Sequence, residues 1–254
     1  MADMTLAGFK QIAGLLVSRR WWRTSLLVVA IMMIMAQLGF WQISRLEHRR
    51  ARNASIINQL AADPLALSEA SFDGDLSSLE YRPAYASGAY DHSREIILKG
   101  QVWRGQPGVH LITPLILSGS PRAVLVDRGW IPYDKAERRQ LAQFAEPGPV
   151  IVTGLIRSSD PPPDATTTVT NTMYEYYRVD IATLQSQIPY DLLPVYLQQS
   201  PNRGSNINPP IRTQPPFELS EGRHLGYAIQ WYLFVIVLGA GYLYYLRKNT
   251  WPDL

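Results

Sequence analysis

Two long apolar runs without a charged residue constrain this chain more than any other feature. They cover Thr24–Ser44 and Leu225–Leu246, which are 21 and 22 residues long. At about 1.5 Å of rise per residue, a helix of that length spans roughly 30 Å, the thickness of the hydrocarbon core of a bilayer. Each run therefore predicts a transmembrane helix, and two crossings place both termini on the same side of the membrane.

The first run could instead be a cleaved signal peptide, because Arg19, Arg20 and Arg23 precede it. However, it is longer than the roughly 7 to 15 apolar residues of such a peptide, and no small-residue cleavage site follows. The second run ends at Arg247 and Lys248, as interfacial anchors would end it. We therefore expect two spanning helices.

Charge does not decide the orientation of these helices, because six basic residues flank them on each side. They are Lys10, Arg19, Arg20, Arg23, Arg247 and Lys248 on the terminal side, and Arg45, Arg49, Arg50, Arg52, Arg212 and Arg223 on the loop side. Residues 5–17 carry apolar side chains at helical spacing, which fits either a short helix on the membrane surface or an unstructured tail.

The expected organisation has five parts: an N-terminal segment (1–23), a first transmembrane helix (24–44), a β-rich domain (45–223), a second transmembrane helix (224–246) and a tail (247–254). We expect the first helix to extend into water as far as Asp63-Pro64. The region between the spans is long enough for one hydrophobic core. The chain has no cysteine, which excludes disulfides, thiolate metal sites and cysteine nucleophiles.

Short β-type runs separated by Gly and Pro fill the region between the spans. We predict strands at 82–91, 95–103, 110–117, 123–130, 150–157 and 195–199, short helices at 134–144 and 180–187, and exposed loops at 160–172 and 200–216. Their spacing favours antiparallel hairpins that close into a small barrel or sandwich. The predicted fold class is thus an α+β membrane protein with two transmembrane helices flanking a mostly antiparallel β domain with short helices.

Several function classes lack support in the sequence. No nucleophile elbow, zinc-protease motif or phosphate-binding loop is present, so we expect no enzyme activity. A copper donor is not expected either, because Met32, Met33 and Met35 lie inside the first span and only Met173 lies in the loop. We expect membrane lipid but no nucleic acid among the partners.

The candidate site residues gather where the two spans meet the same membrane surface. His224, Tyr227 and Trp231 share one face of the second helix at i, i+3, i+7 spacing. On the first helix, Gln37, Trp41 and Arg45 recur every four residues, and His48 continues that face.

Two hypotheses fit this group of residues. In the first, His224 binds haem iron through a neutral imidazole nitrogen, and Arg45 or Arg223 pairs with the propionates. In the second, the same side chains are ordinary interfacial residues that contact headgroups and water.

Three further features between the spans have less specific interpretations. His92 lies in a predicted turn, where we expect it to be solvated, and His110 begins a strand, where a packing role is expected. Arg128-Gly129-Trp130 could bind a partner, but it also fits a tight strand exit over the core, which is the favoured interpretation.

The order of short motifs resembles that of the Surfeit locus protein 1 family, membrane proteins that assist the assembly of haem-copper cytochrome c oxidase. The motifs are Leu38-Gly39-Phe40-Trp41-Gln42 with Arg45, Tyr81-Arg82-Pro83, Gly88-Ala89-Tyr90-Asp91, residues 106–115 (QPGVHLITPL), residues 124–132 (VLVDRGWIP), residues 152–157 (VTGLIR) and residues 224–231 (HLGYAIQW). The chain departs from the family pattern at Asp127, usually Asn, and at Ser220–Arg223, where Asn residues are usual.

The resemblance implies an assembly factor in a bacterial inner membrane, with both termini in the cytoplasm and the β domain outside. It implies the oxidase catalytic subunit and the haem a synthesis enzyme as partners. It also implies transient haem a as the one candidate cofactor, with His224 as the iron ligand. Two rival functions stay open: a stable accessory subunit of a respiratory complex, and a membrane-tethered domain for an unrelated ligand.

Overall fold

The computed structural model of the chain describes residues 14, 16–70, 72, 76–160, 174–201, 208–213 and 219–250. The chain forms two compact units, Met1–Ala54 with Glu218–Leu254, and Ser55–Phe217. The first unit holds two long helices, and the second holds the β-rich domain. Most of the helix predicted within residues 5–17, and most of the loop predicted at 160–172, lie outside the described residues.

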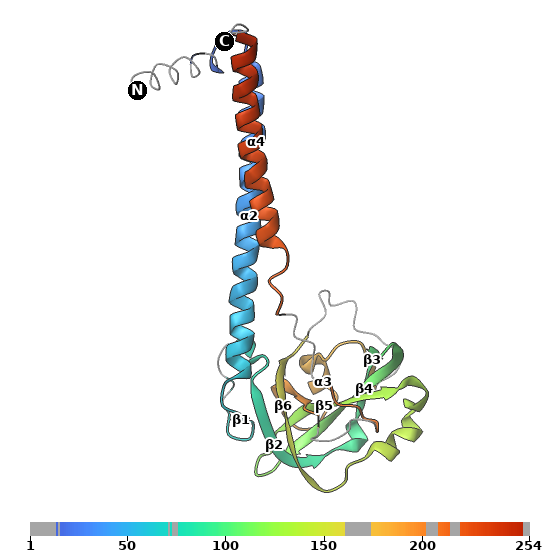
Figure 1. Cartoon of the computed structure of the whole chain (residues 1–254). Helices are drawn as coiled ribbons and strands as arrows, with labels where there is room; N and C mark the ends of the chain where they lie inside the picture. The colour runs from blue at the N-terminus through green and yellow to red at the C-terminus, as the bar shows by residue number, and fades with distance from the viewer. Residues whose placement is uncertain are drawn as a thin grey trace. The chain divides into compact units, whose positions relative to one another are not determined.

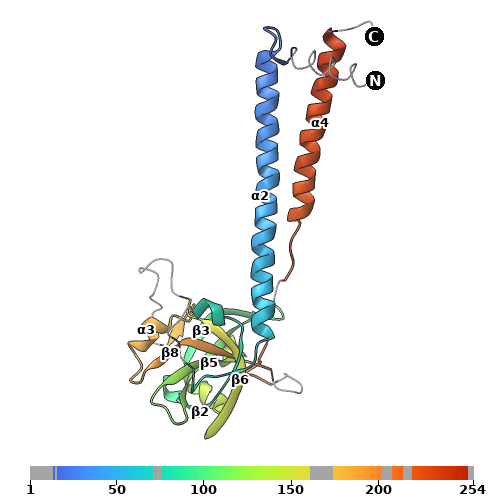
Figure 2. The same ribbon diagram turned by 90° about the vertical axis from the view of Figure 1, so that its left-hand side faces the viewer.

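The two long helices, α2 (Trp22–Leu60) and α4 (His224–Thr250), run side by side in opposite directions (Figures 1 and 2). Both are long and apolar enough to cross a membrane. Only 6% of an apolar 18-residue stretch of each helix is buried. A core helix of a soluble protein would be mostly buried, so the outward-facing apolar side chains support a membrane protein. Both predicted spans are confirmed as helices, and α2 continues to Leu60, as expected.

Small and hydroxyl-bearing side chains bring α2 and α4 together. Gly39 of α2 is buried, and a Cβ at that position would lie 3.0 to 3.2 Å from the ring of Tyr232. Ser25 Oγ lies 2.7 Å from the hydroxyl of Tyr242, so these two polar groups of the apolar runs hydrogen-bond to each other. Close approach at small residues and interhelical hydrogen bonds are the usual means of helix association in membranes.

The β-rich unit is built on a ring of strands whose hydrogen bonds close on themselves. The ring strands are β2 (Pro83–Tyr90), β4 (Gln106–Leu117), β5 (Ala123–Pro132), β6 (Pro149–Ser158) and β8 (Leu192–Gln199). They pair in the order β2-β6-β8-β5-β4, and β4 pairs again with β2. Within this ring the β5–β8 pairing is parallel and the others are antiparallel. The β domain is therefore a small barrel.

Short elements complete the unit around this barrel. Strand β3 (Ile96–Trp103) pairs with β4, and the two-residue strands β1 (Leu65–Ala66) and β7 (Glu175–Tyr176) pair in parallel with β2 and β3. Helix α3 covers Ile181–Gln185, and 3-10 helices cover Leu76–Leu79, His92–Arg94, Tyr133–Lys135 and Arg138–Phe144. All six predicted strands are present. The two-residue strands were not predicted, because two residues carry too little pattern.

Strand β4 begins four residues earlier than predicted, at Gln106 instead of His110. Trp103 pairs with Gln106, so Arg104 and Gly105 alone make the turn between β3 and β4. Both have positive φ angles, 49° and 79°, as a two-residue hairpin turn of the I′ type requires. The prediction had ended one strand at residue 103 and begun the next at residue 110.

Strand β5 runs through the centre of the packing, and its residues from Ala123 to Ile131 are all buried. Val124 and Val126 belong to the barrel interior, together with side chains of β2, β4, β6 and β8. Leu125 and Ile131 belong to two outer clusters, which also contain Leu184 of α3 and Phe144. Both faces of β5 are therefore covered, which explains the unbroken apolar run from Ala123 to Val126.

Strand β5 contains a β-bulge at Arg128. The next residue, Gly129, has no side chain, which lets the segment around Ile211 approach the strand closely. Leu111 pairs with Gly129 while Ile112 pairs with Asp127, so Arg128 is the extra residue. Trp130 exchanges backbone hydrogen bonds of 2.9 and 2.7 Å with Ile211, in the segment that leads back towards α4. The strand ends at Pro132, two residues beyond the predicted end, and Trp130 is buried, as predicted.

We predict that Gly129→Ala destabilises the protein more than Gly105→Ala does. Both glycines have positive φ, 113° and 79°, which makes any Cβ unfavourable by about 1 to 2 kcal/mol. At Gly129 the new Cβ would also lie 2.5 Å from the Ile211 carbonyl oxygen, whereas at Gly105 it would meet nothing within 4 Å. The melting temperature of the full chain in detergent should therefore fall further for Gly129→Ala, by about 4 °C or more. Equal shifts would contradict the role given to Gly129.

Candidate functional site

The first candidate site lies in the helical unit, at the start of α4. His224 Nδ1 lies 2.8 Å from Oε1 of Gln42. In the neutral ring, Nδ1–H donates to this oxygen, which leaves the lone pair of Nε2 available. Gly222 has a φ of 73°, and a Cβ there would lie 3.5 Å from Nε2, so the glycine keeps space beside this nitrogen. Metal-ligating histidines are typically held in this way, through their second ring nitrogen.

The predicted site residues of α2 do not lie on the face that contacts α4. Gly39, Gln42 and Leu46 follow helical spacing, and they form the face on which Gly39 and Gln42 contact α4. Trp41 and Arg45 lie on another face, where both are exposed, Trp41 to 52%. The structure thus pairs His224 with Gln42, which was not predicted as a site residue.

The predicted residues of α4 differ in their exposure. Ala228 is buried, whereas Tyr227 is 48% exposed. Trp231 is partly exposed and packs edge-on against Phe234, with ring centroids 5.9 Å apart. Tyr227 and Trp231 are therefore placed as interfacial or ligand-facing aromatics would be, one turn and two turns from His224.

Hydrogen bonds connect the segment just before α4 to α2. Arg50 donates two hydrogen bonds, of 2.9 and 2.8 Å, to the carboxylate of Glu221, and Asn53 Nδ2 donates to the carbonyl of Leu219. This forked geometry fixes the orientation of the two side chains. Glu221 is one of the positions that depart from the family pattern, and Arg50 balances its charge.

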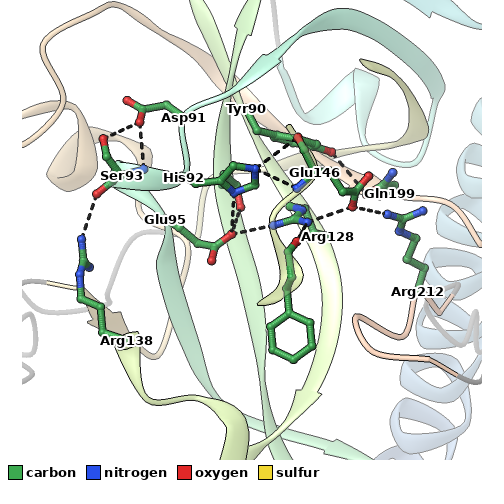
Figure 3. Close-up of polar contacts among 12 residues, drawn as sticks. Tyr90, Asp91, His92, Ser93, Glu95, Arg128, Arg138, Glu146, Gln199 and Arg212 are labelled. Carbon is green, nitrogen blue, oxygen red and sulfur yellow. Dashed lines mark hydrogen bonds and ion pairs between the residues drawn. The ribbon is translucent and has the colours of Figure 1, made fainter. Parts of the chain in front are cut away.

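A second constellation, in the β-rich unit, surrounds the fully buried guanidinium of Arg128 (Figure 3). Its Nη1 donates to Glu95 Oε2 at 2.8 Å, and its Nη2 donates to Glu146 Oε1 at 2.9 Å and to the carbonyl of Phe144. The guanidinium carbon lies 4.9 Å from the centre of the Tyr90 ring. A buried charge is tolerated only with such partners.

The network extends from Arg128 to three further side chains. Thr113 Oγ1 donates to Glu95 Oε2 at 2.5 Å, and Arg212 Nη2 donates to Glu146 Oε1 at 2.8 Å. The backbone N–H of Glu146 donates to His92 Nε2 at 3.1 Å, which leaves Nδ1–H on the side of Glu95, 3.6 Å away. His92 is therefore enclosed, with 26% of its side chain exposed, and the prediction of a solvated His92 is wrong.

Charge balance explains the chemistry of this network. Two carboxylates face two guanidinium groups, so the buried cluster is close to neutral when His92 is neutral. Burial alone would raise the pKa of Glu146, but Arg128 and Arg212 together hold that pKa below its usual value. Glu146 therefore stays ionised at neutral pH, and it joins Arg128 of β5 to Arg212.

His110 and Asp127 form a separate buried pair on neighbouring strands. His110 Nδ1 lies 2.8 Å from Asp127 Oδ2, and the Gly129 N–H donates to Asp127 Oδ1 at 3.0 Å. Burial would lower the pKa of His110, but the Asp127 carboxylate raises it above its usual value. His110 thus has the packing role that was predicted, together with a carboxylate partner at the position where the family pattern usually has Asn.

No group of three or more His, Asp or Glu side chains in the described parts of the chain is arranged to hold a metal ion. A haem iron is a different case, because the porphyrin supplies four of its ligands and the protein needs to supply only an axial one. His224, the residue predicted for this role, has its Nε2 beside the space that Gly222 leaves.

Comparison with known proteins gives a consistent result. Residues 29–236 match the SURF1 family. A SURF1-like protein of Monosiga brevicollis is 26% identical over 225 residues, covering 84% of this chain and 83% of that protein. Surfeit locus protein 1 of Mus musculus is 29% identical over 139 residues, 44% of its length. The cytochrome oxidase assembly protein SHY1 of Saccharomyces cerevisiae is 32% identical over 110 residues, which are 43% of this chain and 28% of that protein.

We predict that Arg128→Met strongly destabilises the protein, because it leaves Glu95 and Glu146 without their shared counter-charge. Breaking a buried ion pair from one side typically costs about 3 to 5 kcal/mol, or a melting temperature lower by about 10 °C in a protein of this size. Arg139→Met is the matched control, since the Arg139–Glu137 pair is 80% and 55% exposed. The control should change stability by less than about 1 kcal/mol. Similar losses for both variants would contradict the role of Arg128.

We predict that the His110–Asp127 pair makes stability depend on pH. The folded-state pKa of His110 lies above its usual value of 6.5, so its contribution is fully present below that pH and is lost as the pH rises through the folded-state pKa. Between about pH 6 and about pH 9, the melting temperature of the native chain should therefore fall more than that of His110→Gln. Parallel pH profiles for the two proteins would show that the pair does not contribute in this way.

Proposed function

Because this chain belongs to the SURF1 family, we propose that it is an assembly factor for haem-copper cytochrome c oxidase. The family match confirms the resemblance seen in the motifs, and the name of the yeast relative supports the proposed role. In this proposal the protein is not an enzyme. It holds the catalytic subunit of the oxidase while haem a is inserted, or stabilises that subunit afterwards.

The proposed location is a bacterial inner membrane, with α2 and α4 spanning it and both termini in the cytoplasm. The β-rich unit then lies on the outer side. The proposed partners are the oxidase catalytic subunit, the haem a synthesis enzyme and membrane lipid. The apolar, outward-facing α2 and α4 support a contact with the membrane-embedded part of the oxidase, because their side chains are available for packing.

The residues at the start of α4 fit haem a as a transiently held group. His224 offers Nε2, Gln42 holds the ring through Nδ1, and Gly222 keeps space beside Nε2. Arg49 lies close to the same space, since its Nη1 is 4.0 Å from a Cβ built at Gly222. Arg49 is therefore better placed than Arg45 to pair with a propionate, whereas the prediction had considered Arg45 and Arg223.

The single observation that carries the haem proposal is the hydrogen bond between His224 and Gln42. An interfacial histidine that only contacts headgroups has no need of an amide partner on the neighbouring helix. A histidine that binds iron gains from this partner, because the hydrogen bond fixes the tautomer and the orientation of the ring.

We predict that His224→Ala abolishes the haem a absorption of protein co-expressed with the haem a synthesis enzymes. The iron would lose its axial nitrogen, and the chain has no cysteine to replace it. Gln42→Leu should weaken haem retention about 10-fold or more, as the loss of an outer-shell partner typically does. His48→Ala is the control, because His48 is exposed on α2 and should leave the spectrum unchanged. A full complement of haem a in the His224→Ala protein would contradict the assignment of the haem site to His224.

The propionate assignment can be tested in the same preparations. Arg49→Gln should lower haem retention more than Arg45→Gln, because only Arg49 adjoins the space beside Nε2. Equal effects of the two changes would indicate a general influence of positive charge instead of a specific pairing.

Deletion of the gene should lower the amount of assembled oxidase, and the protein should be substoichiometric in the active enzyme. A one-to-one ratio in purified oxidase would instead identify an accessory subunit, the main rival function. The measurement is the oxidase haem spectrum of membranes, combined with quantification of this chain in the purified complex. Normal oxidase levels in the deletion strain would contradict both accounts.

A further inference from the structure

A cavity of about 650 Å³ opens in the β-rich unit between the start of β3, the 3-10 helix Arg138–Phe144 and helix α3. Its volume lies within the range of ordinary ligand pockets, roughly 300 to 1,000 Å³. Three aliphatic side chains in its lining, Ile96, Leu184 and Ile188, are buried at 7%, 1% and 8% exposure. The cavity is therefore apolar on this side.

Two arginine side chains line the cavity, and hydrogen bonds to backbone carbonyls hold both guanidinium groups in place. Arg94 Nη1 donates to the carbonyl of Gln187 at 3.0 Å. Arg138 Nη2 donates to the carbonyl of Ser93 at 2.9 Å (Figure 3). The guanidinium of Arg138 also lies 5.1 Å from the Tyr174 ring. Each arginine side chain has five N–H donors, so donors remain for an added acceptor. Pre-ordered side chains lose little entropy when they bind.

The charges around the cavity leave an excess of positive charge. Glu95 lines the cavity, but its carboxylate is paired with Arg128 and accepts a hydrogen bond from Thr113. Glu137 forms an ion pair with Arg139, the residue that follows Arg138. Asp91 offsets part of the charge of Arg94. The two guanidinium groups still outnumber this carboxylate, so they favour an anionic group on the ligand.

We propose that this cavity binds the C-terminal residue of a partner polypeptide, with its carboxylate at Arg94 and Arg138 and its apolar side chain against Ile96, Leu184 and Ile188. Arg94, Arg138 and the three aliphatic residues line the same cavity, so a residue that carries both a carboxylate and an apolar side chain matches it. The other lining residues include Ser93, Ser186 and Gln187, whose polar groups suit a peptide backbone better than an acyl chain. This inference goes beyond the oxidase proposal and does not depend on it.

The test uses the full chain in an uncharged detergent and N-acetyl-leucine as the probe, with binding followed by ligand-observed NMR. We expect a dissociation constant of about 1 mM, and at least tenfold weaker binding of both N-acetyl-leucinamide and N-acetylglycine, which lack the carboxylate and the side chain respectively. Arg94→Gln and Arg138→Gln should each weaken binding of N-acetyl-leucine about tenfold, as the loss of a charge-assisted hydrogen bond does. Both arginines are exposed, so their replacement should leave the melting temperature unchanged.

Arg139→Gln is the matched control, since it removes the same charge from the adjacent residue and should leave binding unchanged. Equal weakening by Arg139→Gln, equal binding of the acid and the amide, or no binding of N-acetyl-leucine would overturn the proposal. Tighter binding of decanoate that depends on Arg94 and Arg138 would assign the cavity to an acyl chain and would also overturn it. None of these results would affect the oxidase proposal, which is tested by oxidase abundance.

Discussion

The buried guanidinium of Arg128 is the constraint on which the arrangement of the β-rich unit depends. A cation without exposure to water needs charged partners close by. Those partners come from separate parts of the chain: Glu95 before β3, the carbonyl of Phe144, and Glu146, which also binds Arg212. Satisfying one charge therefore requires four chain segments to be in place together. The bulge in β5 makes this possible, because it inserts Arg128 as an extra residue between Asp127 and Gly129.

The helical unit solves a different problem, which is how two apolar helices recognise each other in lipid. Burial of apolar surface gives little preference there, because the lipid is equally apolar. Gly39 admits the Tyr232 ring, Ser25 pairs with Tyr242, and His224 pairs with Gln42. These contacts specify the register of the helix pair along its length. The Arg50–Glu221 pair then fixes the point at which the chain enters α4.

Much of the fold could be predicted from the sequence, because it depends on local patterns. Uncharged runs indicated α2 and α4, and alternation with Gly and Pro indicated the strands. The parallel insertion of β8 between β5 and β6 could not be predicted, since hairpin logic pairs only strands that are neighbours in sequence. Glu95 and Glu146 were missed for a similar reason: isolated acidic residues carry no pattern. A signal did exist, because an arginine inside the apolar strand 123–131 requires buried carboxylates, but it does not say which ones.

The candidate haem site was predicted only in part. Helical spacing correctly placed His224, Tyr227 and Trp231 on one side of α4, but it could not show which side of each helix contacts the other. That choice depends on Gly39 and Ser25, whose small size matters only once the partner helix is present. Gln42 therefore carried only a general signal. Its amide is polar within an apolar run, and such a residue usually has a partner on a neighbouring helix.

The position of β8 in the barrel has a consequence for the biogenesis of the protein. Strands β5 and β6 are synthesised first, yet their facing edges are joined only by β8, which is the last of the five ring strands to leave the ribosome. Until then the growing chain exposes two unpaired apolar edges, which are templates for aggregation and sites for proteases. A chain that is cut short before Leu192 cannot close the ring. The topology thus makes synthesis as far as β8 a condition for a closed barrel.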